Sequence, residues 1–184
     1  MAQPGAQTSV GWRAWGGLAD ACGAGGAAGA VMGGDNVRAV GVQRFRAGVV
    51  IVVRHHGDDR VLAFERDDVP GAWQLPQGGI ENGEEPIDAA RRELVEETGL
   101  GPDDVELVDE FPDWVVYELP AELRAGKTGR GQAQRWFTFR ARSADVVPIP
   151  DGREFVAWDW VDPAWLVDHV VEFRRHGYRR VLRG

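Results

Sequence analysis

Residues 78–100 read GGIENGEEPIDAARRELVEETGL, and this stretch predicts a glycine loop followed by one amphipathic helix. Pro86 suits the first position of a helix, because a helix leaves the N–H of that position without a partner. Gly99 suits the left-handed residue that commonly follows the last helical turn. Apolar residues spaced three and four apart form one helical face: Ile87, Ala90 and Leu94. We therefore predict a helix over residues 86–98 that packs against a core.

Three carboxylates share one face of this helix. Glu93, Glu96 and Glu97 are related by three and four positions, so they lie close together and repel one another. A cation would remove the conflict, and oxygen ligands without His or Cys favour Mg²⁺ or Mn²⁺ over zinc. Because Mg²⁺ often takes substrate phosphates as further ligands, the pattern indicates phosphate chemistry. The alternative is an acidic face that contacts only solvent, the usual meaning of a run of like charges.

The segments on either side predict a mixed α+β fold. Strand-like segments, β-branched or alternating in hydrophobicity, are Phe45–Arg54, Arg60–Glu65, Val105–Leu119 with a bend at Pro112, Gln134–Ala141 and Phe155–Val161. Further helices are expected at Pro163–His169 and Phe173–Leu182. Because strands outnumber helices, the order favours an α+β sandwich over a doubly wound parallel sheet.

The N-terminal residues differ from the rest of the chain. The first 34 residues contain ten Gly and nine Ala and only two charged side chains. Such a segment buries too little apolar surface to offset the loss of chain entropy on folding. We expect residues 1–42 to be a disordered tail, or the product of a wrongly assigned start codon, and residues 43–184 to form the folded domain.

Composition excludes several classes of protein. The chain of 184 residues has a formal net charge of −8, the wrong sign for a protein that coats duplex nucleic acid. Its longest apolar run, Val49–Val53, is too short to cross a membrane. A single cysteine rules out a disulfide framework and fits a cytoplasmic location. The sequence leaves the oligomeric state open.

The stretch from Gly78 to Leu100 resembles the Nudix box, G-x5-E-x7-R-E-U-x-E-E-x-G-U with U aliphatic, at every position. The resemblance implies an α/β/α sandwich around a mixed β-sheet. It also implies hydrolysis of a nucleoside diphosphate linked to another group, with a divalent metal. A Nudix-fold module that binds nucleotides without cleaving them is the alternative, and it predicts an eroded box, whereas this box is intact.

The same resemblance assigns roles within the site. The implied ligands of two or more Mg²⁺ or Mn²⁺ ions are the Gly78 carbonyl and the carboxylates of Glu93, Glu96, Glu97 and the distal Glu154. Glu96 is the candidate general base, with Glu154 as the alternative. Arg92 lies four residues before Glu96 and is expected to orient it. Glu84 and Arg92 are expected to brace the box loop, with Gly78 and Gly99 completing the scaffold.

A narrower resemblance is to the bacterial RNA pyrophosphohydrolases and the related asymmetric dinucleoside tetraphosphate hydrolases. It is carried by WQLPQGGI (73–80), GQAQRWF (131–137), EFVAWDW (154–160) and FRRHGYRRVL (173–182). The implied substrate-binding residues are Arg46, Gln77, Tyr117, Gln132, Gln134, Arg174 and Arg175. This chain departs from the group at Ala47, Ala133 and Arg174, which replace proline, lysine and lysine. The expected substrate is the 5′ triphosphate end of RNA or a dinucleoside polyphosphate.

Deleting residues 1–35 should leave the melting temperature and the turnover nearly unchanged, because a Gly/Ala tract without periodic apolar residues has no core to join. Thermal denaturation and activity of the two proteins test this. A fall of several degrees would instead show that Trp12 or Trp15 docks on the domain.

Overall fold

The structure, a computed structural model, describes residues 44–124, 129–150 and 152–183, so the expected tail over residues 1–42 lies outside the described residues. The strands are β1 (Phe45–Arg54), β2 (Val61–Arg66), β3 (Trp73–Gln74), β4 (Gln77–Gly79), β5 (Val105–Glu110), β6 (Val115–Glu118), β7 (Gly131–Ala141) and β8 (Phe155–Val161). The helices are α1 (Pro86–Thr98), α2 (Pro163–His169) and α3 (Arg175–Leu182), with 3₁₀ turns η1 (Ala121–Leu123) and η2 (Glu172–Arg174).

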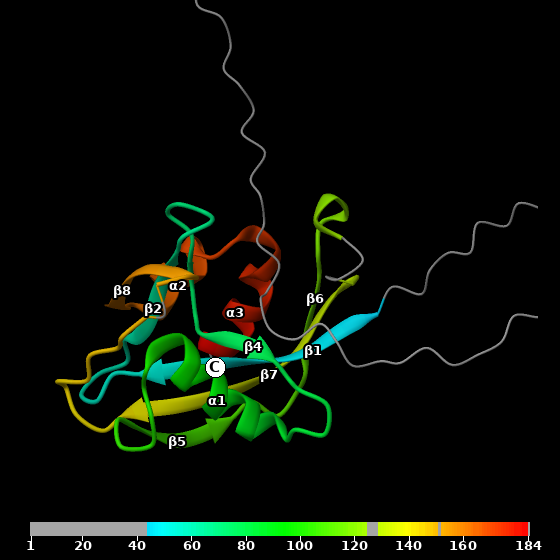
Figure 1. The fold of residues 1–184 in the computed structure, drawn as a ribbon. Coiled ribbons are helices and arrows are strands. Elements are labelled where there is room, and N and C mark those ends of the chain that lie inside the picture. The colour runs from blue at the N-terminus through cyan, green and yellow to red at the C-terminus, as the bar shows by residue number, and fades with distance from the viewer. Residues whose placement is uncertain (1–43, 125–128, 151, 184) are drawn as a thin grey trace, which may run out of the picture.

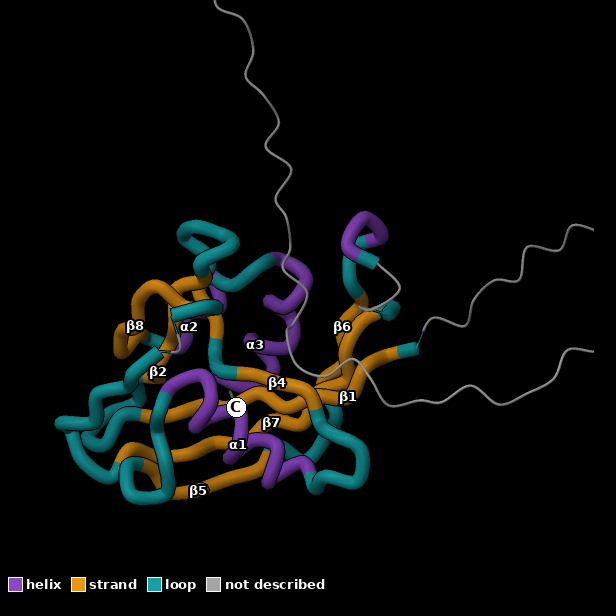
Figure 2. Tube along the Cα trace, in the orientation of Figure 1, coloured by secondary structure: helices purple, strands orange, loops and turns teal. Residues whose placement is uncertain are grey.

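The described strands form one mixed sheet with β1 at its centre. Along its whole length β1 pairs in parallel with β7, from Phe45 opposite Gly131 to Arg54 opposite Arg140. On its other edge β1 pairs antiparallel with β4 and, at its end, with β2. The outer strands are β3 and β8, which both pair with β2, and β5 and β6, which both pair with β7 (Figure 2). The parallel pair in an otherwise antiparallel sheet confirms the predicted mixed arrangement.

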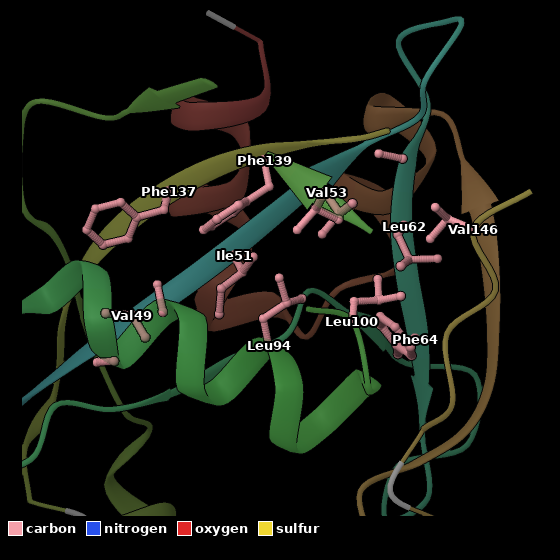
Figure 3. Packing of buried hydrophobic residues seen from close by; sticks show 14 of the residues in the cluster. Val49, Ile51, Val53, Leu62, Phe64, Leu94, Leu100, Phe137, Phe139 and Val146 are labelled. Atoms are coloured by element: carbon pink, nitrogen blue, oxygen red, sulfur yellow. The ribbon is translucent and has the colours of Figure 1, made fainter. Parts of the chain in front are cut away.

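The apolar run of β1 is buried on both faces of the sheet, since successive side chains of a strand point to opposite sides. Val49, Ile51 and Val53 join a cluster that contains Leu94 of α1 (Figure 3). Val50 and Val52 join a second cluster on the opposite face. Helices therefore cover both faces, α1 on one and α2 with α3 on the other, which is the α/β/α sandwich expected from the sequence (Figure 1).

The face under α2 and α3 is closed by aromatic packing. Trp136 of β7 and Tyr178 of α3 are each 1% exposed, and their rings meet edge to face with centroids 5.2 Å apart. The Tyr178 hydroxyl accepts a hydrogen bond from the Leu75 N–H at 3.0 Å. Burial raises the pKa of Tyr178 to about 12, so this side chain stays neutral and α3 is fastened to the segment that leads into β4.

Most predicted elements are confirmed, and the differences lie at strand ends and in the last helix. The segment expected as one bent strand over 105–119 is two strands, because β5 and β6 pair with different parts of β7. β7 begins at Gly131, three residues before the expected start. The expected C-terminal helix over 173–182 is the 3₁₀ turn η2 followed by α3. Among the described residues, no helix combines the length and the apolar character that crossing a lipid bilayer requires.

Replacing Leu94 by alanine should destabilise the fold by about 2–5 kcal/mol, because this side chain is 2% exposed and fills the space between α1 and the sheet. Denaturant unfolding measures the loss. The matched control is Val95→Ala on the next residue, which is 48% exposed and should change stability by no more than about 0.5 kcal/mol. Equal losses in the two variants would contradict the described packing of α1.

Candidate active site

The site begins where α1 touches β4 at Gly78. A Cβ atom at this position would lie 1.6 Å from Cδ of Glu93 and 1.9 Å from its Oε1. No other residue type fits there unless the Glu93 side chain moves away. The glycine thus lets a carboxylate of the helix lie directly on the strand backbone.

A second carboxylate meets the same strand one residue earlier. Oε2 of Glu97 accepts a hydrogen bond from the Gln77 N–H at 3.0 Å, and Glu97 is only 7% exposed. Glu93 and Glu97 are one helical turn apart, so both point from α1 to the Gln77–Gly78 segment. The structure therefore brings two of the predicted metal ligands to one short stretch of β4.

Arg92 ties the loop before the helix to the helix. Its Nε and Nη2 donate to the two carboxylate oxygens of Glu84, both at 2.9 Å, and Nη2 also donates to the Gly79 carbonyl at 2.9 Å. The Arg92 guanidinium lowers the pKa of Glu84, and the Glu84 carboxylate in turn raises the pKa of Arg92. Oε2 of Glu84 also accepts from the Glu81 N–H at 2.8 Å. Arg92 and Glu84, the two residues predicted to brace the box loop, are therefore in direct contact, and their role as a brace stays a prediction.

Glu93 and Glu96 differ in their surroundings. Burial raises the pKa of Glu93, and the nearby Glu96 raises it further, although the hydrogen bond from Arg92 at 2.8 Å acts in the opposite direction. The Glu96 side chain is 59% exposed and lies 3.5 Å from Arg92 Nη1. Glu96 is thus the accessible carboxylate of the three, and the expected contact with Arg92 is present.

The donor set fits a hard divalent cation. The residues around Gly78 offer carboxylate oxygens, and a cation there would offset the burial and repulsion that act on Glu93. Over residues 44–124, 129–150 and 152–183, no three His, Cys, Asp or Glu side chains converge as a ready-made metal site. Two further expected ligands lie outside α1, one on β4 and one just before β8. The Gly78 carbonyl faces Gly48 of β1, and Glu154 precedes β8, where its own carbonyl accepts from the Asp67 N–H at 2.9 Å.

The predicted substrate-binding glutamines form a chain that reaches the helix carboxylates. The Tyr117 hydroxyl and the Gln132 side-chain amide are hydrogen-bonded at 2.7 Å, and the Gln132 and Gln134 amides at 2.9 Å. The amides of Gln134 and Gln77 lie 3.1 Å apart. Because the Gln77 N–H binds Glu97, the chain connects Tyr117 on β6 with α1.

The three predicted substrate-binding arginines occupy different environments. Arg46 is exposed at the start of β1, paired with Gln132 of β7 in the register of the sheet. Arg175 is half-buried and pairs with Glu172 at 2.9 Å. Arg174 is 5% exposed, and its Nη1 donates to Oε1 of Gln74 at 2.7 Å. A residue expected to face a phosphate therefore lies inside the protein in this structure.

Two residues that sequence reasoning missed complete this buried polar cluster. Gln74 accepts from Arg174 and also from Arg66 Nη1, at 2.9 Å. Arg66 is paired with Asp68 through two hydrogen bonds, at 2.8 and 2.6 Å. The available signal was the pair of glutamines Gln74 and Gln77 between apolar strand residues, since polar side chains buried there require partners.

Comparisons with known proteins place the chain beside relatives of one family and one fold. The family model described as NUDIX domain matches residues 44–182. An RNA pyrophosphohydrolase of Dinoroseobacter shibae is 46% identical over 138 residues, covering 71% of this chain and 86% of the relative. Nudix hydrolase 25 of Arabidopsis thaliana is 38% identical over 140 residues, covering 70% and 79%. The solved dihydroneopterin triphosphate pyrophosphohydrolase of E. coli has a TM-score of 0.63 at 22% identity, covers 76% of this chain and 97% of its own, and supports the fold alone.

The Glu84–Arg92 pair should make stability depend on pH. The pKa of Glu84 in the folded state lies below its ordinary value of 4.5, so its stabilisation is present at neutral pH and is lost as the pH falls through the folded pKa. Glu84→Gln should therefore cost about 1.5–3 kcal/mol at pH 7 and progressively less below about pH 4. Denaturant unfolding across this pH range measures the difference. The exposed Glu85→Gln variant is the control, and a loss from Glu84→Gln that does not change with pH would contradict the pairing.

Proposed function

Because the chain belongs to the Nudix family, we propose that it is a divalent-metal-dependent pyrophosphohydrolase that acts on the 5′ triphosphate end of RNA. The observation that carries the proposal is the pair of carboxylates from α1, Glu93 and Glu97, held on consecutive residues of β4 beside an intact brace. Relatives named RNA pyrophosphohydrolase, at 43–46% identity, support RNA as the substrate. A dinucleoside polyphosphate is the alternative substrate, and the experiment below compares the two.

We assign the metal-binding role to Glu93, Glu97 and Glu154, with Glu96 and the Gly78 carbonyl at the same centre. Bound Mg²⁺ or Mn²⁺, in two or more ions, would neutralise charge on the phosphates and lower the pKa of a bound water. The protein's own contribution is to hold the carboxylates before substrate arrives. Gly78 leaves room for Glu93, and the Gln77 N–H fixes Glu97.

Glu96 is the proposed general base, with Glu154 as the alternative. The exposed Glu96 carboxylate can accept a proton from a water at the helix surface. Arg92, at 3.5 Å, limits the directions in which the Glu96 side chain points. Arg92 itself is occupied by Glu84, Glu93 and Gly79, so it acts by positioning these groups.

Arg46, Tyr117 and Gln132 are the proposed contacts for the remote end of the substrate. Arg46 and Gln132 are opposite one another on β1 and β7, and Tyr117 is hydrogen-bonded to Gln132. Within the described residues Arg46 makes no ion pair, so its guanidinium is available to a phosphate. We assign this activity to a domain over residues 43–184 and place it in the cytoplasm, where a 5′ triphosphate end of RNA is available.

Glu97→Gln should lower kcat by about 10²–10⁴-fold, because it removes a charge from the metal centre and keeps the shape and the acceptor for the Gln77 N–H. Activity should also vanish in EDTA and return with Mg²⁺ or Mn²⁺. The measurement is hydrolysis of triphosphorylated RNA and of diadenosine tetraphosphate by the purified protein, ranked by kcat/KM.

The control is Glu85→Gln, an exposed carboxylate at the start of the same helix, which should keep wild-type turnover. Near-wild-type activity of Glu97→Gln would overturn the metal assignment. If kcat/KM is higher for diadenosine tetraphosphate than for triphosphorylated RNA, the proposed substrate becomes the dinucleoside polyphosphate. The assignment as a hydrolase is unaffected by that result.

A further inference from the structure

Arg174 is a buried cation without a counter-ion among the described residues. It is 5% exposed, no described carboxylate lies within ion-pair distance of it, and its Nε has no hydrogen-bond partner there. The other guanidinium bound to Gln74 is that of Arg66, which is paired with Asp68. Burying a charge without a counter-ion costs free energy. The presence of arginine at position 174 therefore calls for a role that a neutral side chain would not fill.

The contacts of Arg174 are two amides and two aromatic faces. Its Nη1 donates to Gln74 at 2.7 Å. A guanidinium can only donate hydrogen bonds, so the Gln77 amide turns its oxygen toward Arg174 and accepts from Nη2 at 2.9 Å. The rings of Tyr117 and Phe173 each lie with their centroids 5.7 Å from the guanidinium carbon. The side chain is thus held in place and spans β3 and β4.

Gln77 is the link from this cation to the carboxylates. It is fully buried, its side chain meets Arg174, and its backbone N–H donates to Glu97 at 3.0 Å. A rotation or shift of Gln77 would therefore move the donor that orients Glu97. Arg174 lies on η2, far along the chain, so it fixes this donor from outside the helix-loop segment that carries the carboxylates.

We propose that Arg174 is a positioning residue for Glu97, acting through Gln77, rather than a direct contact to substrate phosphate. This inference rests on the proposed function only in taking Glu97 as a metal ligand. The guanidinium fork holds the amides of Gln74 and Gln77 together, and the single ammonium of a lysine does not reproduce that two-pronged geometry. Loss of Arg174 consequently loosens the metal site.

The test is Mn²⁺ binding, followed by electron paramagnetic resonance in the absence of substrate, together with kcat and KM. Arg174→Ala should weaken Mn²⁺ binding by about tenfold, the lower end of what partners of metal ligands contribute, and lower kcat more than it raises KM. Arg174→Lys should fold as the wild type does and lose about threefold in Mn²⁺ affinity, so it carries the test if the alanine variant is unstable. The matched control is Arg179→Ala, an exposed arginine on α3 that should change neither quantity.

A double variant tests the route through Gln77. Gln77→Ala keeps the backbone N–H and should reproduce most of the loss in Mn²⁺ affinity. Combining it with Arg174→Ala should add little, because both changes remove the same contact. Additive losses would overturn the route.

Wild-type Mn²⁺ affinity in both Arg174 variants, with a raised KM, would overturn the proposal and return Arg174 to phosphate binding. If the wild type binds Mn²⁺ but hydrolyses neither substrate, the proposed function fails while the Mn²⁺ comparison still decides the role of Arg174. If the wild type binds no Mn²⁺, both proposals are overturned.

Discussion

The contact between α1 and β4 at Gly78 is the constraint on which the site depends. Where a helix packs on a strand, side chains of both elements ordinarily fill the space between them. Gly78 of the strand has no side chain, and the Glu93 side chain of the helix occupies the space that one would fill. The close approach of the helix at this point requires glycine, because a Cβ atom at position 78 would collide with the Glu93 carboxylate. The same close approach brings Glu97 to the Gln77 N–H, so a single missing Cβ places two carboxylates.

Two arginines maintain this arrangement from opposite sides, and they do so in different electrostatic settings. Arg92 is compensated by Glu84 and Glu93 and works within the segment that carries the carboxylates. Arg174 has only amides and aromatic faces around it, in a buried environment where hydrogen bonds are strong and unpaired groups are costly. The segment from Gly78 to Leu100 is therefore stabilised locally by the ion pairs of Arg92. It is stabilised from a distance by the buried polar cluster of Gln74, Gln77 and Arg174.

Local signals allowed α1 to be predicted residue for residue, since Pro86 and Gly99 mark its ends within the sequence itself. The continuous run of β-branched residues likewise allowed β1 to be predicted as a strand, and the structure adds that this run is buried on both faces of the sheet. The burial of Arg174 could not be predicted, because it depends on β6, β3 and η2 meeting in space, and a basic residue beside others in the sequence suggests a surface. The roles of the individual site residues stay predictions, because only the match to a motif assigns them.

The parallel pairing of β1 with β7 has a consequence for the order in which the protein can assemble. The ribosome completes β1 and the whole segment from Gly78 to Leu100 before it begins β7, the longest neighbour of β1. Contacts between distant parts of a chain form late, because closing the intervening loop costs entropy before the pairing repays it. We therefore expect that a nascent chain ending before Gly131 exposes the apolar face of β1, which makes the second half of synthesis the interval in which chaperones and proteases compete for it.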